Sequence, residues 1–413
     1  MTKKLKLRLN QNDIQIVLLF LSMLFLTRQF PFAKLGRLSS YILVISFTVS
    51  IRLMFNNFSK LEKKYKSLTI FYVLLITGLL IKSLLNTNIS LGYSIHTYIT
   101  CLLLIISFFY PKDKRIFKMF VFVMLLHALF MIGLELFLIV KNSPEFDSIF
   151  RNYILINGFG DIYTRNGIYY RIIIKGNELL PVAYLVMYKY KSKKANIIKG
   201  IFILSILISG NLAYFIAIGL FLILNDLFID KKYSSKIIKF FNIKNQKKII
   251  AIGTVLLVLG FIGYKPVKFK VENIIELKSQ YSIPARFDQI GVLIDDMNSG
   301  KDYILGKGLG STVTAVTRYR DYTGNRYFEM QWMYFFYQMG AIAFGILIIL
   351  SIILSIKYMR NKLTILIYLT YIIYGITNPY TFNLTHIIVI ILLTTYDLQL
   401  KEENNNEVNY IYK

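Results

Sequence analysis

The stretch IFKMFVFVMLLHALFMIGLELFLIV, residues 116–140, decides the class of fold. It is long enough to cross the hydrocarbon core of a bilayer as one helix, and charged side chains interrupt it only at Lys118 and Glu135. Apolar runs of about 16–25 residues recur through most of the chain. The 413 residues are 55% hydrophobic with a mean hydropathy of +0.53, which is more apolar than an ordinary soluble domain. We therefore predict an all-α, polytopic integral membrane protein that forms a single transmembrane domain over residues 1–413.

The apolar pattern predicts about twelve transmembrane helices. Residues 197–229 are divided into two of these helices at a polar break, SGN at 209–211, because a single helix would move the basic segment 230–248 to the other side of the membrane. Residues 330–357 are assigned to one long tilted helix, although Gly340 lies inside them. The predicted spans are 13–27, 39–56, 68–86, 93–110, 116–140, 174–189, 197–209, 211–229, 248–264, 330–357, 363–378 and 381–397.

The net charge of +27 lies in short clusters between the apolar runs. A nucleic-acid-binding protein would gather this charge on one face, whereas the positive-inside rule places such clusters in cytoplasmic loops. One basic connection, 28–37, falls on the outer side against this trend. The basic loops 59–66, 111–115, 189–194, 230–248 and 360–362 all fall on the side of the N-terminus. We therefore predict a multi-pass membrane protein with both termini in the cytoplasm.

Two long outer loops, 141–173 and 265–329, are too apolar and aromatic to be disordered. The second loop contains SIPARFDQIGVLIDDMNSG, whose apolar residues predict an amphipathic helix over 282–297. This helix is expected on the outer surface of the bundle, packed on it or at the membrane interface, with Arg286 and Gln289 on a neighbouring flank. Its apolar positions are Ile283, Phe287, Ile290, Ile294 and Met297, at a spacing of 4, 3, 4, 3.

Cationic side chains gather in these outer loops, against the charge bias of the topology. One interpretation is that they reach lipid headgroups along the membrane surface. The other is anion recognition, because the planar guanidinium group binds phosphate or pyrophosphate through two hydrogen bonds. An outward-facing phosphate bound by a membrane protein would be the head of a lipid carrier. The arginines concerned are Arg171 in the first loop and Arg286, Arg318, Arg320 and Arg326 in the second.

Two further features of the second loop have both a structural and a functional interpretation. Glu329 either complements the dipole at the start of the next helix or acts as a general base. The stretch ILGKGLGST, residues 304–312, places Gly306, Gly308 and Gly310 at alternate positions. It lacks the spacing of a nucleotide-binding loop. We expect its glycines to let the backbone approach a bulky lipid-linked sugar or its pyrophosphate.

The sequence predicts no metal site and no cofactor. It contains no HExxH motif and no Asp-rich magnesium motif. The adjacent pair Asp295 and Asp296 lies on the amphipathic helix, where a solvated face is the favoured interpretation. The single cysteine, Cys101, lies inside an apolar run and forms no thiol metal site. The three histidines lie in or beside apolar spans, where we expect each to make a hydrogen bond within the membrane.

The order of these features resembles the O-antigen polymerase/ligase superfamily, the Wzy-type bacterial polysaccharide polymerases. An outer-helix arginine in ARFDQIG is followed by the glycine loop LGKGLGS and by FEMQWMYFFYQMG, which opens on a polar residue and ends in glycine. Two upstream stretches also fit, YYRIIIKGNELLP at 169–181 and SGNLAYFIA at 209–217. The resemblance covers about residues 170–345 by motif. It covers the rest of the chain by topology alone.

The resemblance implies a glycosyltransferase at the outer face of the bacterial plasma membrane. Such enzymes of capsule, exopolysaccharide and O-antigen synthesis transfer a growing glycan from an undecaprenyl-pyrophosphate carrier to another lipid-linked repeat unit, without cofactor or metal. A flippase and a chain-length regulator of the same pathway are the implied protein partners. The resemblance implies Glu329 as the catalytic base, Arg286 and Arg171 as pyrophosphate ligands, and Arg318 or Arg320 as a second clamp. It implies Gly306, Gly308, Gly310, Asn177 and Asn211 as further pyrophosphate- or glycan-binding residues.

Two alternatives belong to other classes of function. A flippase for lipid-linked oligosaccharides, or another transporter, would show paired repeats and broken helices in both halves. The sequence shows one broken span, and its polar residues lie in the outer loops, which favours an enzyme of the outer face. A ligase that attaches the glycan to another acceptor is the second alternative. The ligase branch of the superfamily typically has histidine where this chain has Glu329, so the glutamate favours a polymerase.

Overall fold

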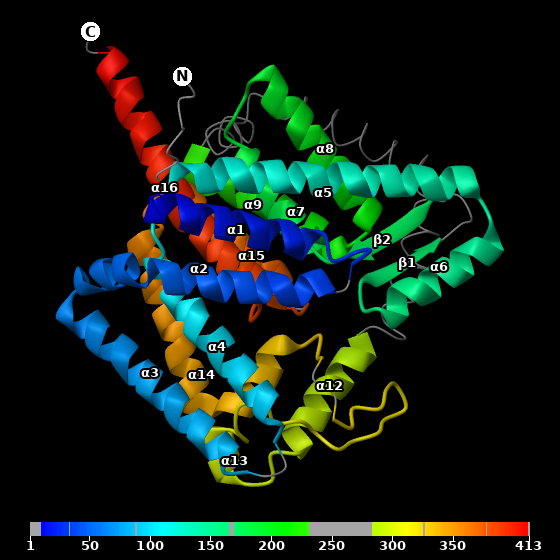
Figure 1. The fold of residues 1–413 in the computed structure, drawn as a ribbon, viewed down its shortest axis with the longest axis vertical. Helices are drawn as coiled ribbons and strands as arrows, with labels where there is room; N and C mark the ends of the chain where they lie inside the picture. The colour runs from blue at the N-terminus through cyan, green and yellow to red at the C-terminus, as the bar shows by residue number, and fades with distance from the viewer. Residues whose placement is uncertain are drawn as a thin grey trace, which may run out of the picture.

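The computed structural model describes residues 10–32, 34–86, 89–164, 169–230, 283–324, 327–376 and 378–411. These residues are mostly helical, as predicted (Figure 1). The α-helices are α1 (Gln11–Thr27), α2 (Lys34–Ser59), α3 (Lys63–Leu84), α4 (Leu91–Ile106), α5 (Lys114–Lys141), α6 (Pro144–Ile156), α7 (Leu180–Met187), α8 (Lys193–Ser209), α9 (Leu212–Asn225), α12 (Ile283–Asp295), α13 (Gly300–Leu305), α14 (Gln331–Tyr358), α15 (Lys362–Ile376) and α16 (Leu384–Ile411). The shorter elements are the 3-10 helices η1 (Ser107–Phe109) and η2 (Asn177–Leu179), the π-helical turn η3 (Asp226–Asp230), and the antiparallel strands β1 (Gly160–Thr164) and β2 (Tyr170–Ile174).

Six helical segments of the described chain are long and apolar enough to cross a membrane. They are α2, α3, α4 with η1, α5, α9 with η3, and α14. This finding supports an all-α membrane protein, but the predicted number of about twelve transmembrane helices is wrong for the described residues. The predicted span 174–189 holds the end of β2, η2 and the eight-residue α7 instead of one long helix. The predicted span 248–264 lies outside the described residues.

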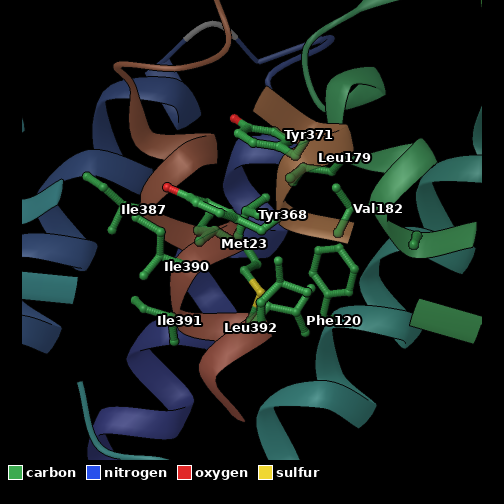
Figure 2. Close-up of a cluster of buried hydrophobic side chains, with 14 of the residues drawn as sticks. Met23, Phe120, Leu179, Val182, Tyr368, Tyr371, Ile387, Ile390, Ile391 and Leu392 are labelled. Carbon is green, nitrogen blue, oxygen red and sulfur yellow. The ribbon is translucent and has the colours of Figure 1, made fainter. Parts of the chain in front are cut away.

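Two of the shorter apolar helices, α7 and α16, pack inside the bundle, where protein surrounds them. Residues 387–393 of α16 are each 2% exposed or less, so this helix is buried around its whole circumference. Figure 2 shows Met23 of α1, Phe120 of α5, Val182 of α7 and Tyr368 of α15 meeting the side chains of α16. A helix enclosed in this way contacts other helices rather than lipid, so its length need not match the thickness of the hydrocarbon core.

The loops that their charge assigns to the cytoplasm meet at one end of the bundle. Lys357, close to the loop 360–362, forms an ion pair with Glu62 at 3.3 Å. Arg115 forms an ion pair with Asp13 at 2.7 Å. The start of α1 and the C-terminal part of α16 also lie on the same side of the molecule (Figure 1). The grouping of 59–66, 111–115 and 360–362 is therefore confirmed, and the assignment of this end to the cytoplasm stays a prediction. Most of the basic segment 230–248 lies outside the described residues.

The loops assigned to the outer side meet at the other end. The Lys82 ammonium group, at the end of α3, donates to the carbonyl oxygen of Gly306 at 2.7 Å. The Ser94 hydroxyl, in the first turn of α4, donates to the carbonyl oxygen of Leu309 at 2.8 Å. The basic connection 28–37 also lies at this end, because the ring of Phe30 packs among aromatic side chains of the first outer loop. Aromatic packing therefore holds this basic connection against the first outer loop.

The predicted polar break at 209–211 is present. α8 ends at Ser209, Gly210 adopts a left-handed conformation with φ 55°, and the Asn211 side chain caps α9 by accepting from the amide of Ala213. Glycine tolerates this backbone geometry, and asparagine is a favoured N-cap residue. The sequence therefore ends one helix and begins the next within two residues.

The predicted single helix over 330–357 is wrong in one respect, because α14 is broken at Gly340. This residue has φ 71° and ψ 174°, which are not helical. A Cβ atom at Gly340 would lie 2.3 Å from the amide nitrogen of Gly306 and 2.5 Å from the carbonyl oxygen of Ile304. The break therefore allows the backbone of the second outer loop to lie directly against α14.

We predict that Gly340→Ala destabilises the folded protein. The positive φ alone costs a residue with a Cβ atom about 1–3 kcal/mol, and the contact with Gly306 adds to this cost. Gly345→Ala is the matched control in the same helix, since a Cβ atom there meets nothing within 4 Å. Thermal unfolding of the purified variants in detergent measures both effects. Equal melting temperatures for the two variants would contradict the role assigned to the break.

Candidate functional site

Helix α12 packs on the outer end of the bundle through a face that the sequence did not predict. Phe287 of the predicted apolar stripe is 68% exposed, whereas Gln289 is 3% exposed and Leu293 is fully buried. The helix forms as predicted, but it turns its polar flank inward. Beneath it lies a small apolar cluster separate from the main core. This cluster comprises Leu293, Met297, Val313, Tyr322, Phe328, Tyr334 and Tyr337.

The inward flank of α12 brings together the two residues predicted to be catalytic. The guanidinium Nη2 of Arg286 lies 2.8 Å from the carboxylate Oε2 of Glu329. The Arg286 side chain is 25% exposed and the Glu329 side chain is 40% exposed, so solvent and a ligand can reach the pair. The sequence alone did not predict that these two side chains form an ion pair.

Gln289 fixes the backbone that carries Glu329. Its buried side-chain oxygen accepts hydrogen bonds from the amide of Glu329 at 2.8 Å and from the amide of Met330 at 3.2 Å. These two amides lie just before α14, where helical partners are missing. Gln289 and Arg286 are three residues apart and share one face of α12, so one helix face holds both the backbone and the side chain of Glu329.

Two tyrosines, Tyr327 and Tyr380, interact electrostatically with this pair and with the first outer loop. Loss of surrounding water raises the pKa of Tyr327 to about 12; the Glu329 charge adds to this effect and the charges of Arg320 and Arg286 oppose it. Burial also raises the pKa of Tyr380, and there Arg171 opposes the shift. Tyr327 adds to the shift at Tyr380 as well. The two tyrosines therefore lie within electrostatic range of cationic groups from both outer loops.

Arg171 is held at the polar break between α8 and α9. Its Nε donates to the carbonyl oxygen of Ser209 at 3.2 Å, and its Nη1 donates to the hydroxyl of Tyr163. A Cβ atom at Gly210 would lie 3.1 Å from the Cγ of Arg171. The break is therefore where this arginine packs between helices.

The two other predicted clamp residues are exposed and stack on aromatic rings. The guanidinium carbon of Arg320 lies 5.9 Å from the ring centre of Tyr327, which places it beside the Arg286–Glu329 pair. The guanidinium carbon of Arg318 lies 4.6 Å from the ring centre of its own neighbour, Tyr319. Arg320 therefore belongs with the candidate site by its contacts. Arg326 lies outside the described residues.

The glycine stretch makes close contacts with the protein itself. A Cβ atom at Gly306 would lie 2.3 Å from the carbonyl oxygen of Gln338, and one at Gly310 would lie 2.7 Å from the amide nitrogen of Ser94. At Gly308 the nearest atom would be the Ser83 hydroxyl, at 2.8 Å. All three glycines have positive φ. Protein fills the space beside each of them, so the stretch joins the break in α14 to the ends of α3 and α4.

The two asparagines predicted to bind substrate make structural contacts. Asn177 is buried; its side chain pairs with the Nε2 of His127 at 2.9 Å and donates to the carbonyl oxygen of Ile172 at 2.8 Å. Asn211 caps α9. The hydrogen bond expected of a histidine within the membrane is thus present at His127, and His386 pairs with Tyr368 at 2.9 Å.

No group of three or more potential metal-ligating side chains occurs within the part of the chain that the structure describes. Asp296 accepts a hydrogen bond from the Tyr337 hydroxyl at 2.6 Å and lies 3.6 Å from the ammonium group of Lys307. This carboxylate is therefore engaged with the protein rather than fully solvated. Asp295, beside it, is exposed as predicted.

Sequence reasoning missed Gln289 as a functional residue and missed both tyrosines. The sequence pattern places Gln289 beside Arg286 on one flank of the helix. A glutamine one turn from a candidate arginine on a buried face is a signal for a residue that anchors backbone amides. Tyr327 and Tyr380 gave no usable signal, because the chain contains 31 tyrosines.

No family model, no curated protein and no solved structure matches this chain.

We predict that Gln289→Leu destabilises the second outer loop. The substitution keeps the size of the side chain but leaves the amides of Glu329 and Met330 without their acceptor, at a cost of about 1–3 kcal/mol. Limited proteolysis of the purified protein should then cut between α13 and α14 faster than in the unchanged protein. Asp295→Asn, on the exposed side of α12, is the control. Unchanged protease resistance in Gln289→Leu would contradict the anchoring role.

Proposed function

We propose that this protein is a bacterial polysaccharide polymerase of the type its sequence resembles. It would transfer a glycan from an undecaprenyl-pyrophosphate carrier to a lipid-linked repeat unit at the outer face of the plasma membrane. The observation that carries this proposal is the Arg286–Glu329 pair, at 2.8 Å, at the end of the bundle where the outer loops meet. A base and a phosphate ligand in contact, with further arginines nearby, are the groups that this transfer needs.

The cationic groups supply the binding step. A pyrophosphate entering the site would compete with Glu329 for the guanidinium group of Arg286, because phosphate oxygens match its paired N–H donors. Arg320, exposed beside Tyr327, is available for a second contact, and Arg171 approaches from the first outer loop. Binding of the donor would therefore release the Glu329 carboxylate at the moment when a base is needed.

The chemical step then balances without a cofactor. The bond between the anomeric carbon of the donor glycan and the pyrophosphate oxygen breaks, and a bond from that carbon to the acceptor hydroxyl oxygen forms. Glu329 accepts the proton of that hydroxyl. The lipid pyrophosphate leaves with the bonding electron pair, and the arginines stabilise its added negative charge. Each of these groups therefore has one role in the step.

The exposed apolar face of α12 supports a substrate that arrives from the membrane. Phe287 is 68% exposed and is the next residue after Arg286. A helix with an exposed apolar face and a cationic flank is suited to the level of the lipid headgroups. The pyrophosphate of a polyprenyl carrier lies at that level, so it would reach Arg286 without leaving the bilayer.

We predict that Arg286→Ala and Glu329→Gln each abolish polymer while the protein level stays normal. The exchanged pair, Arg286→Glu with Glu329→Arg, tests whether the pair is only structural, because it restores the ion pair in reverse. We expect it to recover thermal stability but not polymer synthesis. Asp295→Asn is the acidic control and should leave chain length unchanged. Full-length polymer in Glu329→Gln would show that the base is assigned wrongly.

We further predict that a deletion strain accumulates single repeat units linked to the carrier on the outer face of the membrane. A polymerase acts after the repeat unit has crossed, so its loss stops extension alone. Extraction of lipid-linked intermediates, with an impermeant sugar-modifying enzyme added to intact cells, measures both their length and their side. Repeat units confined to the cytoplasmic side would contradict the polymerase and would indicate a flippase instead.

A further inference from the structure

A cavity of about 470 Å³ lies between α6 and the β1–β2 hairpin in the first outer loop. Its volume falls in the range of small-molecule sites, about 300–1,000 Å³. It is separate from the Arg286–Glu329 pair, and none of the residues predicted to be functional lines it. Its polar and aromatic lining includes Asp147, Arg151, Asn152, Tyr163, Thr164 and Tyr170.

Asp147 lines this cavity, and one of its carboxylate oxygens has no hydrogen-bond partner among the described residues. One carboxylate oxygen, Oδ2, accepts a hydrogen bond from the Tyr170 hydroxyl at 2.6 Å. The other oxygen, Oδ1, is buried and has no hydrogen-bond partner among the described residues. A buried carboxylate oxygen without a donor is costly, and native proteins retain such a group where a ligand or water completes its bonding.

Tyr170 holds that carboxylate in place. Burial and the neighbouring Asp147 raise the pKa of Tyr170 to about 12, so its hydroxyl stays protonated and donates to Asp147 at neutral pH. The backbone amide of Tyr170 donates to Glu135 at 3.0 Å, which ties the strand to α5. The orientation of Asp147 is thus set from β2, and its Oδ1 has no donor among the described residues.

The cavity adjoins the Arg171 region through one aromatic ring. The guanidinium carbons of Arg151 and Arg171 lie 5.2 Å and 5.6 Å from the ring centre of Tyr163. Arg151 is already paired with Asp161 at 2.8 Å, so its charge is largely satisfied. The Tyr163 ring, which lines the cavity, is therefore held beside both arginines.

The charges of the cavity select the class of ligand. An anion would be repelled by Asp147, and Arg151 is already paired with a carboxylate. A metal ion would need several oxygen ligands, and no such group is present in the described chain. A neutral molecule with many hydroxyl groups meets no such repulsion and can donate a hydrogen bond to the Asp147 carboxylate.

We propose that the cavity between α6 and the β1–β2 hairpin binds a sugar of the lipid-linked repeat unit, with Asp147 Oδ1 accepting a hydrogen bond from a sugar hydroxyl. The inference rests on the proposed function for the source of the sugar. The cavity would hold a sugar of one glycan while the pyrophosphate of the donor lies at the arginines. Asp147 and Tyr170 would then determine which repeat units the protein accepts.

Protection from thiol labelling tests this site without any turnover. In the purified full-length protein in detergent, Asn152→Cys places a thiol on the wall of the cavity, while the native Cys101 is fully buried and should not react. The probes are oligosaccharides of one and two repeat units, released from the carrier lipid of the deletion strain. We expect them to slow maleimide labelling at least fivefold, whereas sucrose at the same concentration leaves the rate unchanged.

A second substitution links the protection to Asp147. Adding Asp147→Asn should remove the protection, and adding Tyr170→Phe should weaken it, while Asp295→Asn should leave it intact. An unchanged labelling rate without sugar shows that each variant retains its fold. Equal protection with and without Asp147→Asn, or no protection in the parent variant, would overturn the proposal.

The outcomes for this site and for the polymerase are separable. If the deletion strain accumulates single repeats but oligosaccharides give no protection, the sugar site is wrong and the proposed function stands. If oligosaccharides protect the introduced thiol but intermediates are trapped on the cytoplasmic side, the sugar site stands and the polymerase is wrong. Binding is read from the labelling rate in one case and function from cellular intermediates in the other.

Discussion

The contact between the backbones of Gly306 and Gly340 is the constraint on which the outer end of this protein depends. No side chain fits between the two residues, since a Cβ atom on Gly340 would lie 2.3 Å from the amide nitrogen of Gly306. The contact breaks α14 and fixes the second outer loop against the broken helix. Gln289 can then reach the amide of Glu329, and Arg286 can reach its carboxylate. One close approach of backbone thus places the candidate site.

Much of the helical fold could be predicted from sequence, because apolar runs and basic loops record the two solvents that a membrane protein meets. The break at Gly210 and the grouping of loops at two ends followed from this reasoning. The number of membrane-crossing helices did not, since apolar composition is the same for a helix that faces lipid and for one enclosed by other helices, such as α16. Hydropathy alone therefore counted enclosed helices as full spans.

The candidate site was predictable in its residues and less so in its geometry. The amphipathic pattern located α12 but left open which way its apolar stripe faces, because an apolar stripe near a membrane can face lipid as readily as a protein core. Phe287 of that stripe is exposed. The glycine spacing predicted a backbone that lies close to a ligand, whereas the three glycines lie close to Gln338, Ser83 and Ser94. Spacing in the sequence shows that the backbone must approach something closely. It does not show what it approaches.

The pairing of Arg286 with Glu329 fits the proposed function only if the pair can open. A half-exposed ion pair contributes about 0–1 kcal/mol after the costs of desolvation and side-chain ordering. A pyrophosphate carries more than one negative charge, so it attracts the guanidinium group more strongly than a single carboxylate at the same distance. Under the proposed function, the anion would therefore compete with Glu329 for Arg286. Under the proposed function, a weak ion pair would preserve the arrangement of α12 over α14 in the resting protein and would keep Glu329 from acting as a base until the leaving group is bound.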